Sequence, residues 1–240
     1  MNKRLTLGLL LVTLSCSAQW VAATEQRHFS GSQPLLDHHG KSEITQLKLK
    51  VPTGNITIRS AESDNVTYEV NVKEEPSSWF GADLDDLVLE HQVVGQTLYL
   101  TINEEDVSQQ WTVTVPKSLA LNVRLGVGNV EASAISQPFT ADIGVGAVWL
   151  ALDPARFNQI DANVAVGEIQ VRGLDSARVK LKRQLVSETL NYTGQGDHPV
   201  AIQIGVGDVN ISQHTVPDAA PDTVAVLTQS RSLSQNHSYY

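Results

Sequence analysis

Apolar and polar residues alternate along most of the chain, in short runs that are separated by glycine motifs. Before one motif, Val123 and Leu125 are two positions apart, and Val130 and Ala132 repeat this spacing after it. A period of two is typical of a strand with one buried face. The same spacing surrounds the other motifs, in the pairs Leu49 and Val51, Ile56 and Ile58, Ala141 and Ile143, Val148 and Leu150, Ala162 and Val164, Ile169 and Val171, Ile202 and Ile204, and Val209 and Ile211. The pattern predicts repeated units of strand, turn and strand.

The turn of each unit carries a recurring glycine motif. Gly-Val-Gly stands at 126–128, 144–146 and 205–207, with Ala-Val-Gly at 165–167 and Pro-Thr-Gly at 52–54. The turn glycines are Gly54, Gly126, Gly128, Gly144, Gly146, Gly167, Gly205 and Gly207. Glycine suits a corner at which φ is positive or another backbone passes close by. The motif lacks both the G-x-G-x-x-G of dinucleotide sites and the Gly-Lys-Ser/Thr end of a P-loop, so we interpret it as structural.

The spacing of these turns makes the chain repetitive, with a unit of roughly 20 residues. One unit alone leaves its apolar face exposed. Units stacked at the strand spacing of about 4.8 Å bury a continuous apolar column instead. The sequence therefore predicts an all-β fold: a repetitive β-solenoid of roughly 20-residue coils, or a flattened, two-faced sandwich of such coils.

Further strands are predicted outside the glycine units, over 65–73, 87–94, 97–103 and 110–115. A turn at Val94-Gly95-Gln96 is expected to join the second and third of them as a hairpin. The segment 74–87 carries no sign of a unit. Residues 176–190 could form a helix, but Ala177, Val179 and Leu181 alternate, which favours a strand.

The N-terminus has the three parts of a secretory signal peptide. Lys3 and Arg4 precede an apolar run and a small-residue site that ends at Ala23, so we predict that residues 1–23 are removed. The sequence Thr-Leu-Ser-Cys at 13–16 is similar to a bacterial lipobox, and a lipid anchor at Cys16 is the alternative. The predicted organisation continues with a loosely ordered polar segment over 24–43, a repetitive β domain over 44–214 and a flexible tail over 215–240.

Charge and cysteine content narrow the function classes. Removal of the signal peptide takes away two basic residues, which leaves 15 basic against 26 acidic side chains and a net charge of −11. Such a chain repels phosphate backbones, so nucleic acid is not an expected partner. Cys16 is the only cysteine and lies within the signal peptide, so the mature chain has no cysteine for disulfide or thiolate chemistry.

No catalytic signature and no cofactor site are evident. Neither a G-x-S-x-G elbow nor an H-E-x-x-H helix occurs. Calcium is considered because some β-rolls bind it through turns of the form Gly-Gly-x-Gly-x-Asp. The positions that would carry the acid are Asn129, Ala147, Glu168 and Asp208. Since acids are not regular there, no catalytic, cofactor or metal residue is predicted.

Taken together, the strand–turn–strand units, here called rungs, resemble a known family. This family is the bacterial putative-adhesin β-helix domains of cell-envelope proteins, which are largely of unknown function. The matching residues are Leu-Lys-Val-Pro-Thr-Gly-Asn-Ile-Thr-Ile at 49–58, Val-Thr-Val-Pro-Lys at 113–117, and the glycine rungs as far as Ile211. The resemblance covers roughly residues 44–212. It implies a right-handed β-helix-like fold and a location in the periplasm or at the cell surface, and it implies no catalytic residues.

One place on the predicted surface is a candidate for binding a partner. It is a turn-rich loop with exposed aromatic and acidic side chains, Trp79, Phe80, Asp83, Asp85 and Asp86. Aromatic side chains on loops anchor partners well, although these two could instead fold back and cap the end of the stack. Trp149 lies between Val148 and Leu150 and therefore faces away from them, but a single tryptophan does not define a binding face.

These observations predict an exported, non-enzymatic cell-envelope protein with an adhesin-like, partner-binding or envelope-sensing role. The expected partner is a protein or a glycan of the envelope. One alternative is a polysaccharide-acting enzyme, which needs acid and base groups that converge on one groove. That reading requires three of the acids Asp142, Asp161, Glu168 and Asp208 to cluster on one face. The other alternative is a purely structural scaffold.

Overall fold

The computed structural model describes residues 26–36, 43–74 and 84–214, and there the predicted all-β fold class is confirmed. Apart from short 3-10 turns, every regular element in this part of the chain is a strand. The strands are β1 (Gln26–Pro34), β2 (Gln46–Ala61), β3 (Asn65–Glu74), β4 (Glu90–Val94), β5 (Thr97–Thr101), β6 (Val107–Pro116), β7 (Ala120–Ile135), β8 (Phe139–Leu152), β9 (Phe157–Val166), β10 (Ile169–Arg172), β11 (Val179–Gln184), β12 (Ser187–Thr193) and β13 (His198–Gln213).

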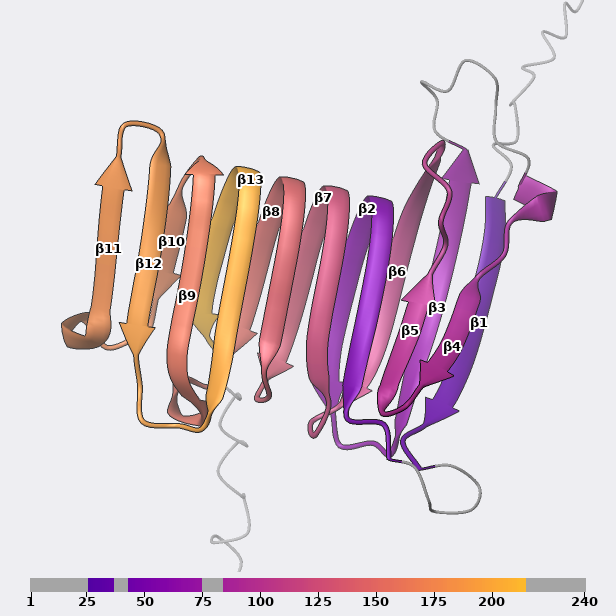
Figure 1. The fold of residues 1–240 in the computed structure, drawn as a ribbon, viewed down its shortest axis with the longest axis horizontal. Coiled ribbons are helices and arrows are strands. Elements are labelled where there is room, and N and C mark those ends of the chain that lie inside the picture. Colours follow the sequence, from indigo (N-terminus) through magenta and orange to yellow (C-terminus); the bar gives the residue numbers. More distant parts are fainter. Residues whose placement is uncertain (1–25, 37–42, 75–83, 215–240) are drawn as a thin grey trace, which may run out of the picture.

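Four long strands form the middle of the molecule, and each is bent at its glycine motif (Figure 1). β2, β7, β8 and β13 lie side by side in this order and pair in parallel and in register. Each strand runs up one layer, turns over at the glycines and returns on the other layer. We call the layer of the first halves the front sheet and the layer of the second halves the back sheet.

The burial pattern explains why each strand bends. Before the turn of β7 the buried residues are Val123 and Leu125, and after it they are Val130 and Ala132. The buried positions are thus odd-numbered before the glycines and even-numbered after them. Because of this change of phase, both halves of a bent strand point their apolar side chains into the space between the two sheets. One continuous core results.

Gly146 illustrates why the corners need glycine. Its φ is 148°, which side chains rarely adopt, and a Cβ at this position would overlap the carbonyl oxygen of Gly128 on the neighbouring strand. Gly207 repeats this relationship one strand further, with a φ of 139° over the carbonyl oxygen of Gly146. The second glycines of the motif therefore form a column in which the backbones pass too close for any side chain.

Shorter strands extend both sheets. Next to β2, β5 pairs with its first half and β6 with its second half. β4 continues the front sheet beyond β5, and β3 and then β1 continue the back sheet beyond β6. At the opposite end, β9 and β10 pair with the two halves of β13, and the β11–β12 hairpin extends the front sheet beyond β9.

The order of the strands corrects one prediction. The predicted stack of roughly 20-residue coils does not continue through the whole described part of the chain, because β13, the last described strand, lies between β8 and β9 (Figure 1). The long interval between Gly167 and Gly207 does not hold a further coil. It holds the β11–β12 hairpin, so the range 176–190 is strand rather than helix, as predicted, but it is divided between two strands. Residues 176–178 form a 3-10 turn, and the two strands flank Leu185 and Val186.

The other strand predictions agree with the structure, with shifted ends. β3, β4, β5 and β6 occupy the four ranges predicted before residue 116, and the expected hairpin joins β4 to β5 with Gly95 at a φ of 60°. The polar segment before residue 44 differs from the expectation of loose order. Its residues 26–34 form β1, which pairs along its whole length with β3.

Candidate functional site

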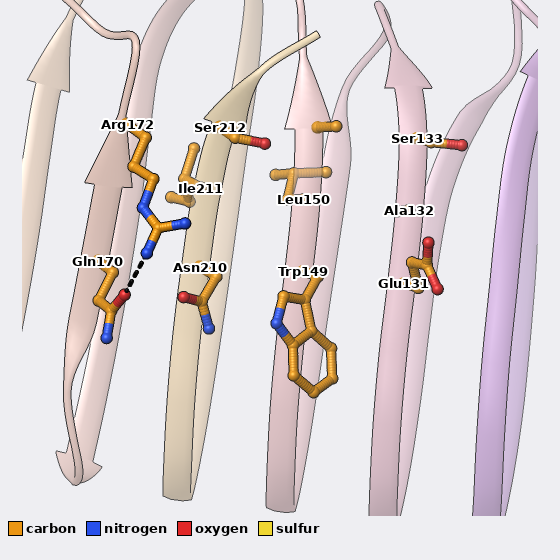
Figure 2. A pocket seen from close by; sticks show the side chains of 11 residues that line it. Glu131, Ala132, Ser133, Trp149, Leu150, Gln170, Arg172, Asn210, Ile211 and Ser212 are labelled. Atoms are coloured by element: carbon orange, nitrogen blue, oxygen red, sulfur yellow. Dashed lines mark hydrogen bonds between the residues drawn. The ribbon is translucent and has the colours of Figure 1, made fainter.

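A groove of about 410 Å³ crosses the back sheet around Trp149. Its floor is formed by the second halves of β7, β8 and β13 and by β10, which lie side by side (Figure 2). The indole of Trp149 lies between the side chains of Glu131 and Asn210, and Gln170 and Arg172 stand on the far side of Asn210. The groove therefore combines one large aromatic surface with polar side chains from four strands.

The register of the sheet places these side chains in one row. Glu131 is directly opposite Trp149 in the β7–β8 ladder, Asn210 is opposite Trp149 in the β8–β13 ladder, and Gln170 is opposite Asn210. Neighbouring strands are about 4.8 Å apart, so the polar side chains of the row lie at regular intervals on either side of the indole ring. An extended ligand lying across the strands would meet all four side chains.

Trp149 itself is set by the alternation of β8. Val148 and Leu150 are buried in the core, while 45% of Trp149 is exposed, as the sequence predicted. A large aromatic residue exposed in the middle of a sheet is suited to binding, since it offers apolar area at little cost in side-chain entropy. The N–H of the indole provides an additional hydrogen-bond donor.

The polar neighbours retain hydrogen-bonding capacity. Arg172 donates a hydrogen bond from Nη2 to Oε1 of Gln170, at 3.3 Å. This contact uses one of the five N–H donors of the guanidinium and leaves the amide nitrogen of Gln170 free to donate. Within the described residues, the carboxylate of Glu131 and the amide of Asn210 form no side-chain hydrogen bond. The groove thus offers both donors and acceptors to a ligand.

The loop predicted to bind a partner is described only in part. Trp79, Phe80 and Asp83 lie outside the described residues. Asp85 and Asp86 belong to a 3-10 turn, η1 (Leu84–Asp86), and both are exposed. Arg27 on β1 fixes this turn by donating hydrogen bonds to the backbone oxygens of Leu84 and Asp85. This part of the loop is therefore anchored against the back sheet, far from the Trp149 groove (Figure 1).

The four acids that would support an enzyme are divided between two places. Asp142 and Asp161 face outwards on the front sheet, on strands that are separated by β13. Glu168 and Asp208 lie at the glycine corner, where the carboxylate of Asp208 accepts a hydrogen bond from the backbone N–H of Glu168 at 3.0 Å. No three of them share a face, so the condition for the polysaccharide-acting enzyme is not met.

Within residues 26–36, 43–74 and 84–214, no three His, Cys, Asp or Glu side chains are grouped in a way that could hold a metal ion. Over the same ranges, no helix has the length and apolar character needed to cross a bilayer.

Two features of the structure escaped the sequence analysis. One is a second groove on the front sheet, where Lys48, Lys50 and Arg124 come together from two strands. The other is the buried carboxylate of Glu188 at the β11–β12 end, which binds Ile169 and Arg183. Both depend on which strands become neighbours. Local alternation, the signal used for the prediction, carries no information about this.

Comparison with known proteins gives structural similarity only. Neither a family model nor a curated protein matches the chain. A crystal structure described as a putative cell adhesion protein from Clostridium sporogenes has 13% sequence identity and a TM-score of 0.41, and the match covers 78% of this chain and 100% of that one. Structures of putative adhesins from Bacteroides fragilis and Parabacteroides distasonis each have 12% identity, with TM-scores of 0.28 and 0.24. They cover 77% and 78% of this chain and 97% of each of those chains.

These matches are to bacterial putative adhesins, the kind of protein that the strand–turn–strand units resemble, and each covers 77% or 78% of this chain. At TM-scores below 0.5 they carry no argument about the fold or the function of this chain.

Proposed function

We propose that this protein is an exported, non-enzymatic component of a bacterial cell envelope that binds a glycan chain in the Trp149 groove. The observation that carries the proposal is the exposed indole of Trp149 in a row with Glu131, Asn210 and Gln170. Binding sites for small polar ligands typically combine apolar or aromatic surface with a few placed polar groups. A sugar ring meets both needs, because its C–H face packs on an aromatic ring and its hydroxyls bond to amides and carboxylates.

The architecture supports this role. The parallel strands from β2 to β13 form a platform that holds the row of side chains on paired strands rather than on loops. A site built on paired strands is pre-organised, which lowers the entropy lost when a flexible glycan binds. Export to the periplasm or the cell surface is proposed on the signal-peptide pattern of residues 1–23.

A direct test uses chitohexaose, a soluble neutral oligosaccharide, and the mature chain from residue 24. Titration should perturb the fluorescence of Trp149, because the ring is exposed in the free protein. The Trp149→Ala variant should lose about tenfold or more in affinity, as expected for removing an aromatic anchor. Isothermal titration calorimetry measures this change.

The control is Leu181→Ala on β11, where 46% of the leucine is exposed. This variant also removes a partly exposed apolar side chain, but one that lies outside the groove, and it should bind chitohexaose normally. If Trp149→Ala and Leu181→Ala bind equally well, or if a panel of neutral glycans gives no binding at all, the proposed groove function is wrong. Protease treatment of intact cells, compared with treatment of cells whose outer layer is opened, then distinguishes a surface location from a periplasmic one.

A further inference from the structure

The front sheet carries a groove of about 320 Å³ that differs in character from the Trp149 groove. Three basic side chains line it: Lys48 and Lys50 on β2 and Arg124 on β7. Tyr99 and Thr101 on β5 form its opposite side. The three basic side chains gather here although acidic residues outnumber basic residues in the chain by 26 to 17.

The three cations are close neighbours in the sheet. Lys50 is directly opposite Arg124 in the β2–β7 ladder, and Lys48 lies two residues before Lys50 on the same face. Like charges directly opposite one another destabilise a sheet. Glu90 at the rim and Asp142 beside Arg124 are the nearest carboxylates in the ladder, yet among the described residues neither forms an ion pair with any of the three.

Neutral partners position the two lysines. The ammonium of Lys48 lies over the ring of Tyr99, 5.2 Å from its centroid, and donates to the tyrosine oxygen at 3.3 Å. The ammonium of Lys50 donates to Oδ1 of Asn103 at 3.1 Å. Each ammonium has three donors, so both lysines keep donors for a ligand and neither charge is neutralised by the protein.

An unpartnered hydroxyl lies in the same groove. Oγ1 of Thr101 is buried and has no hydrogen-bond partner among the described residues, the one side-chain atom there of which this holds. Thr101 is directly opposite Lys50 and lines the groove. A buried polar atom without a partner costs free energy, and a hydroxyl or an anionic oxygen of a ligand could satisfy it.

We infer that this front groove binds an acidic sugar unit, whose anionic group is held between Lys50 and Arg124. The arginine fork suits a carboxylate or another planar or tetrahedral oxyanion, and Lys48 adds a further charge-assisted hydrogen bond. Asn122, Gln92 and Thr101 supply neutral polar groups for the hydroxyls of the ring. The site is on the opposite sheet from Trp149 and does not depend on the glycan proposed for that groove.

The test uses hexagalacturonate and its fully methyl-esterified form, which have the same rings and differ in charge. The mature protein should bind the charged form at least about tenfold more tightly, because charge-assisted hydrogen bonds are the strong ones. The Lys50→Ala/Arg124→Ala variant should lose this difference, whereas Trp149→Ala should retain it. Affinity for the charged form should also fall as salt is raised.

A matched control is Lys180→Ala/Lys182→Ala, which removes the same amount of charge from the exposed edge strand β11. It should bind like the unaltered chain, and thermal unfolding of both double variants verifies that they fold. Equal loss in the two double variants would mean a general charge effect and would overturn the assignment. Equal binding of the two hexasaccharides would also overturn the assignment. So would a preference for phosphatidylglycerol vesicles over hexagalacturonate, because the groove would then bind an anionic lipid surface.

Discussion

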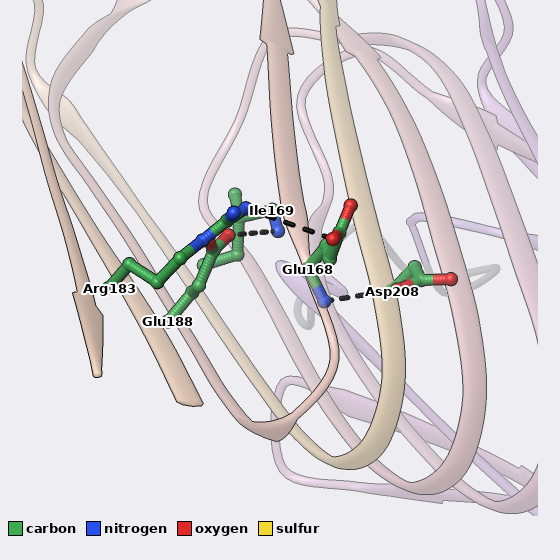
Figure 3. A network of polar contacts seen from close by, with 5 residues as sticks. All are labelled: Glu168, Ile169, Arg183, Glu188 and Asp208. Carbon is green, nitrogen blue, oxygen red and sulfur yellow. Dashed lines mark hydrogen bonds and ion pairs between the residues drawn. The ribbon is translucent and has the colours of Figure 1, made fainter. Parts of the chain in front are cut away.

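The carboxylate of Glu188 on β12 accepts a hydrogen bond from the backbone N–H of Ile169 on β10, at 2.6 Å (Figure 3). This bond joins the front sheet to the back sheet at the end where the stack of bent strands stops. Glu188 is 1% exposed, and Arg183 from the neighbouring strand β11 also donates to its carboxylate. A buried charge is tolerated here because two donors satisfy it.

Replacement of Glu188 by alanine should destabilise the protein. The variant leaves the buried N–H of Ile169 without an acceptor, which costs about 1–3 kcal/mol in the free energy of unfolding. Urea unfolding followed by circular dichroism measures the change. Glu168→Ala is the matched control, because the side chain of Glu168 is 61% exposed and its ion pair with Arg183 spans 3.8 Å, and exposed ion pairs contribute little. Equal effects of the two variants would contradict a special role for Glu188.

The same carboxylate should make stability depend on pH. Burial opposes the ionised form of Glu188, but the hydrogen bond from Ile169 and the contact with Arg183 outweigh it and hold its pKa below the ordinary value of 4.5. A lowered folded pKa stabilises the protein above the unfolded pKa, and this stabilisation is lost as the pH falls through the folded pKa. The stability difference between the unaltered chain and Glu188→Gln should therefore be larger at neutral pH than near a pH of about 3. A difference that does not change with pH would contradict this assignment.

The glycine column gives a comparison within one motif. Gly146→Ala should cost about 1–3 kcal/mol from its backbone conformation alone, and the clash with the carbonyl oxygen of Gly128 adds to this. Gly144 has no positive φ, so Gly144→Ala should be the milder variant of the pair, although its Cβ would still come within 2.6 Å of the carbonyl oxygen of Gly126. Midpoints of thermal unfolding test the order. The opposite order would contradict this account, because Gly146 has both the positive φ and the closer contact with a neighbouring backbone.

Much of this architecture could be read from local pattern. The alternation at Val123, Leu125, Val130 and Ala132 defined both arms of β7 and their buried sides, since a strand with one buried face has a period of two. The position of β13 could not be read in this way. Val200, Ile202 and Ile204 alternate like every other arm, so nothing local indicates that they pair with both β8 and β9.

For the candidate sites, the limit of the sequence is the register between strands. The outward direction of Trp149 followed from its buried neighbours. Its partners Glu131 and Asn210 did not, because they are far away in the chain and become neighbours only through the ladders. The basic groove has the same origin, since Lys50 and Arg124 meet across β2 and β7.

One buried polar pair should be as sensitive as the apolar core. Trp111 is fully buried and donates from Nε1 to Oε1 of Gln109 at 2.9 Å, and the amide of Gln109 donates to the backbone oxygen of Ile102 at 3.0 Å. Gln109 is directly opposite Gly54 in the β2–β6 ladder. The glycine motif of the other units is missing between β5 and β6. Trp111→Phe should cost at least about 1–3 kcal/mol, because it leaves the buried oxygen of Gln109 without a donor.

Trp149→Phe is the control for this prediction, since a substitution at an exposed position usually changes stability by no more than about 0.5 kcal/mol. The two variants make the same chemical change at a buried and at an exposed site. Urea unfolding curves for both should therefore separate clearly. If Trp149→Phe were as destabilising as Trp111→Phe, the indole on the back sheet would have a structural role, and this would weaken the case for a binding surface there.

The insertion of β13 between β8 and β9 predicts that the last described strand is essential for folding. A chain that ends at residue 197 lacks β13 and leaves the facing edges of β8 and β9 unpaired along most of their length. It also removes Val200, Ile202 and Ile204 from the centre of the core. Since apolar burial contributes about 25 cal/mol per Å² and exposed edges promote aggregation, this chain should not form a stable monomer.

A chain that ends at residue 214 retains every described strand and should unfold cooperatively at nearly the temperature of the longer chain. A stable, monomeric product from the shorter truncation, measured by light scattering and thermal unfolding, would show that the rungs before β13 fold as a separate unit.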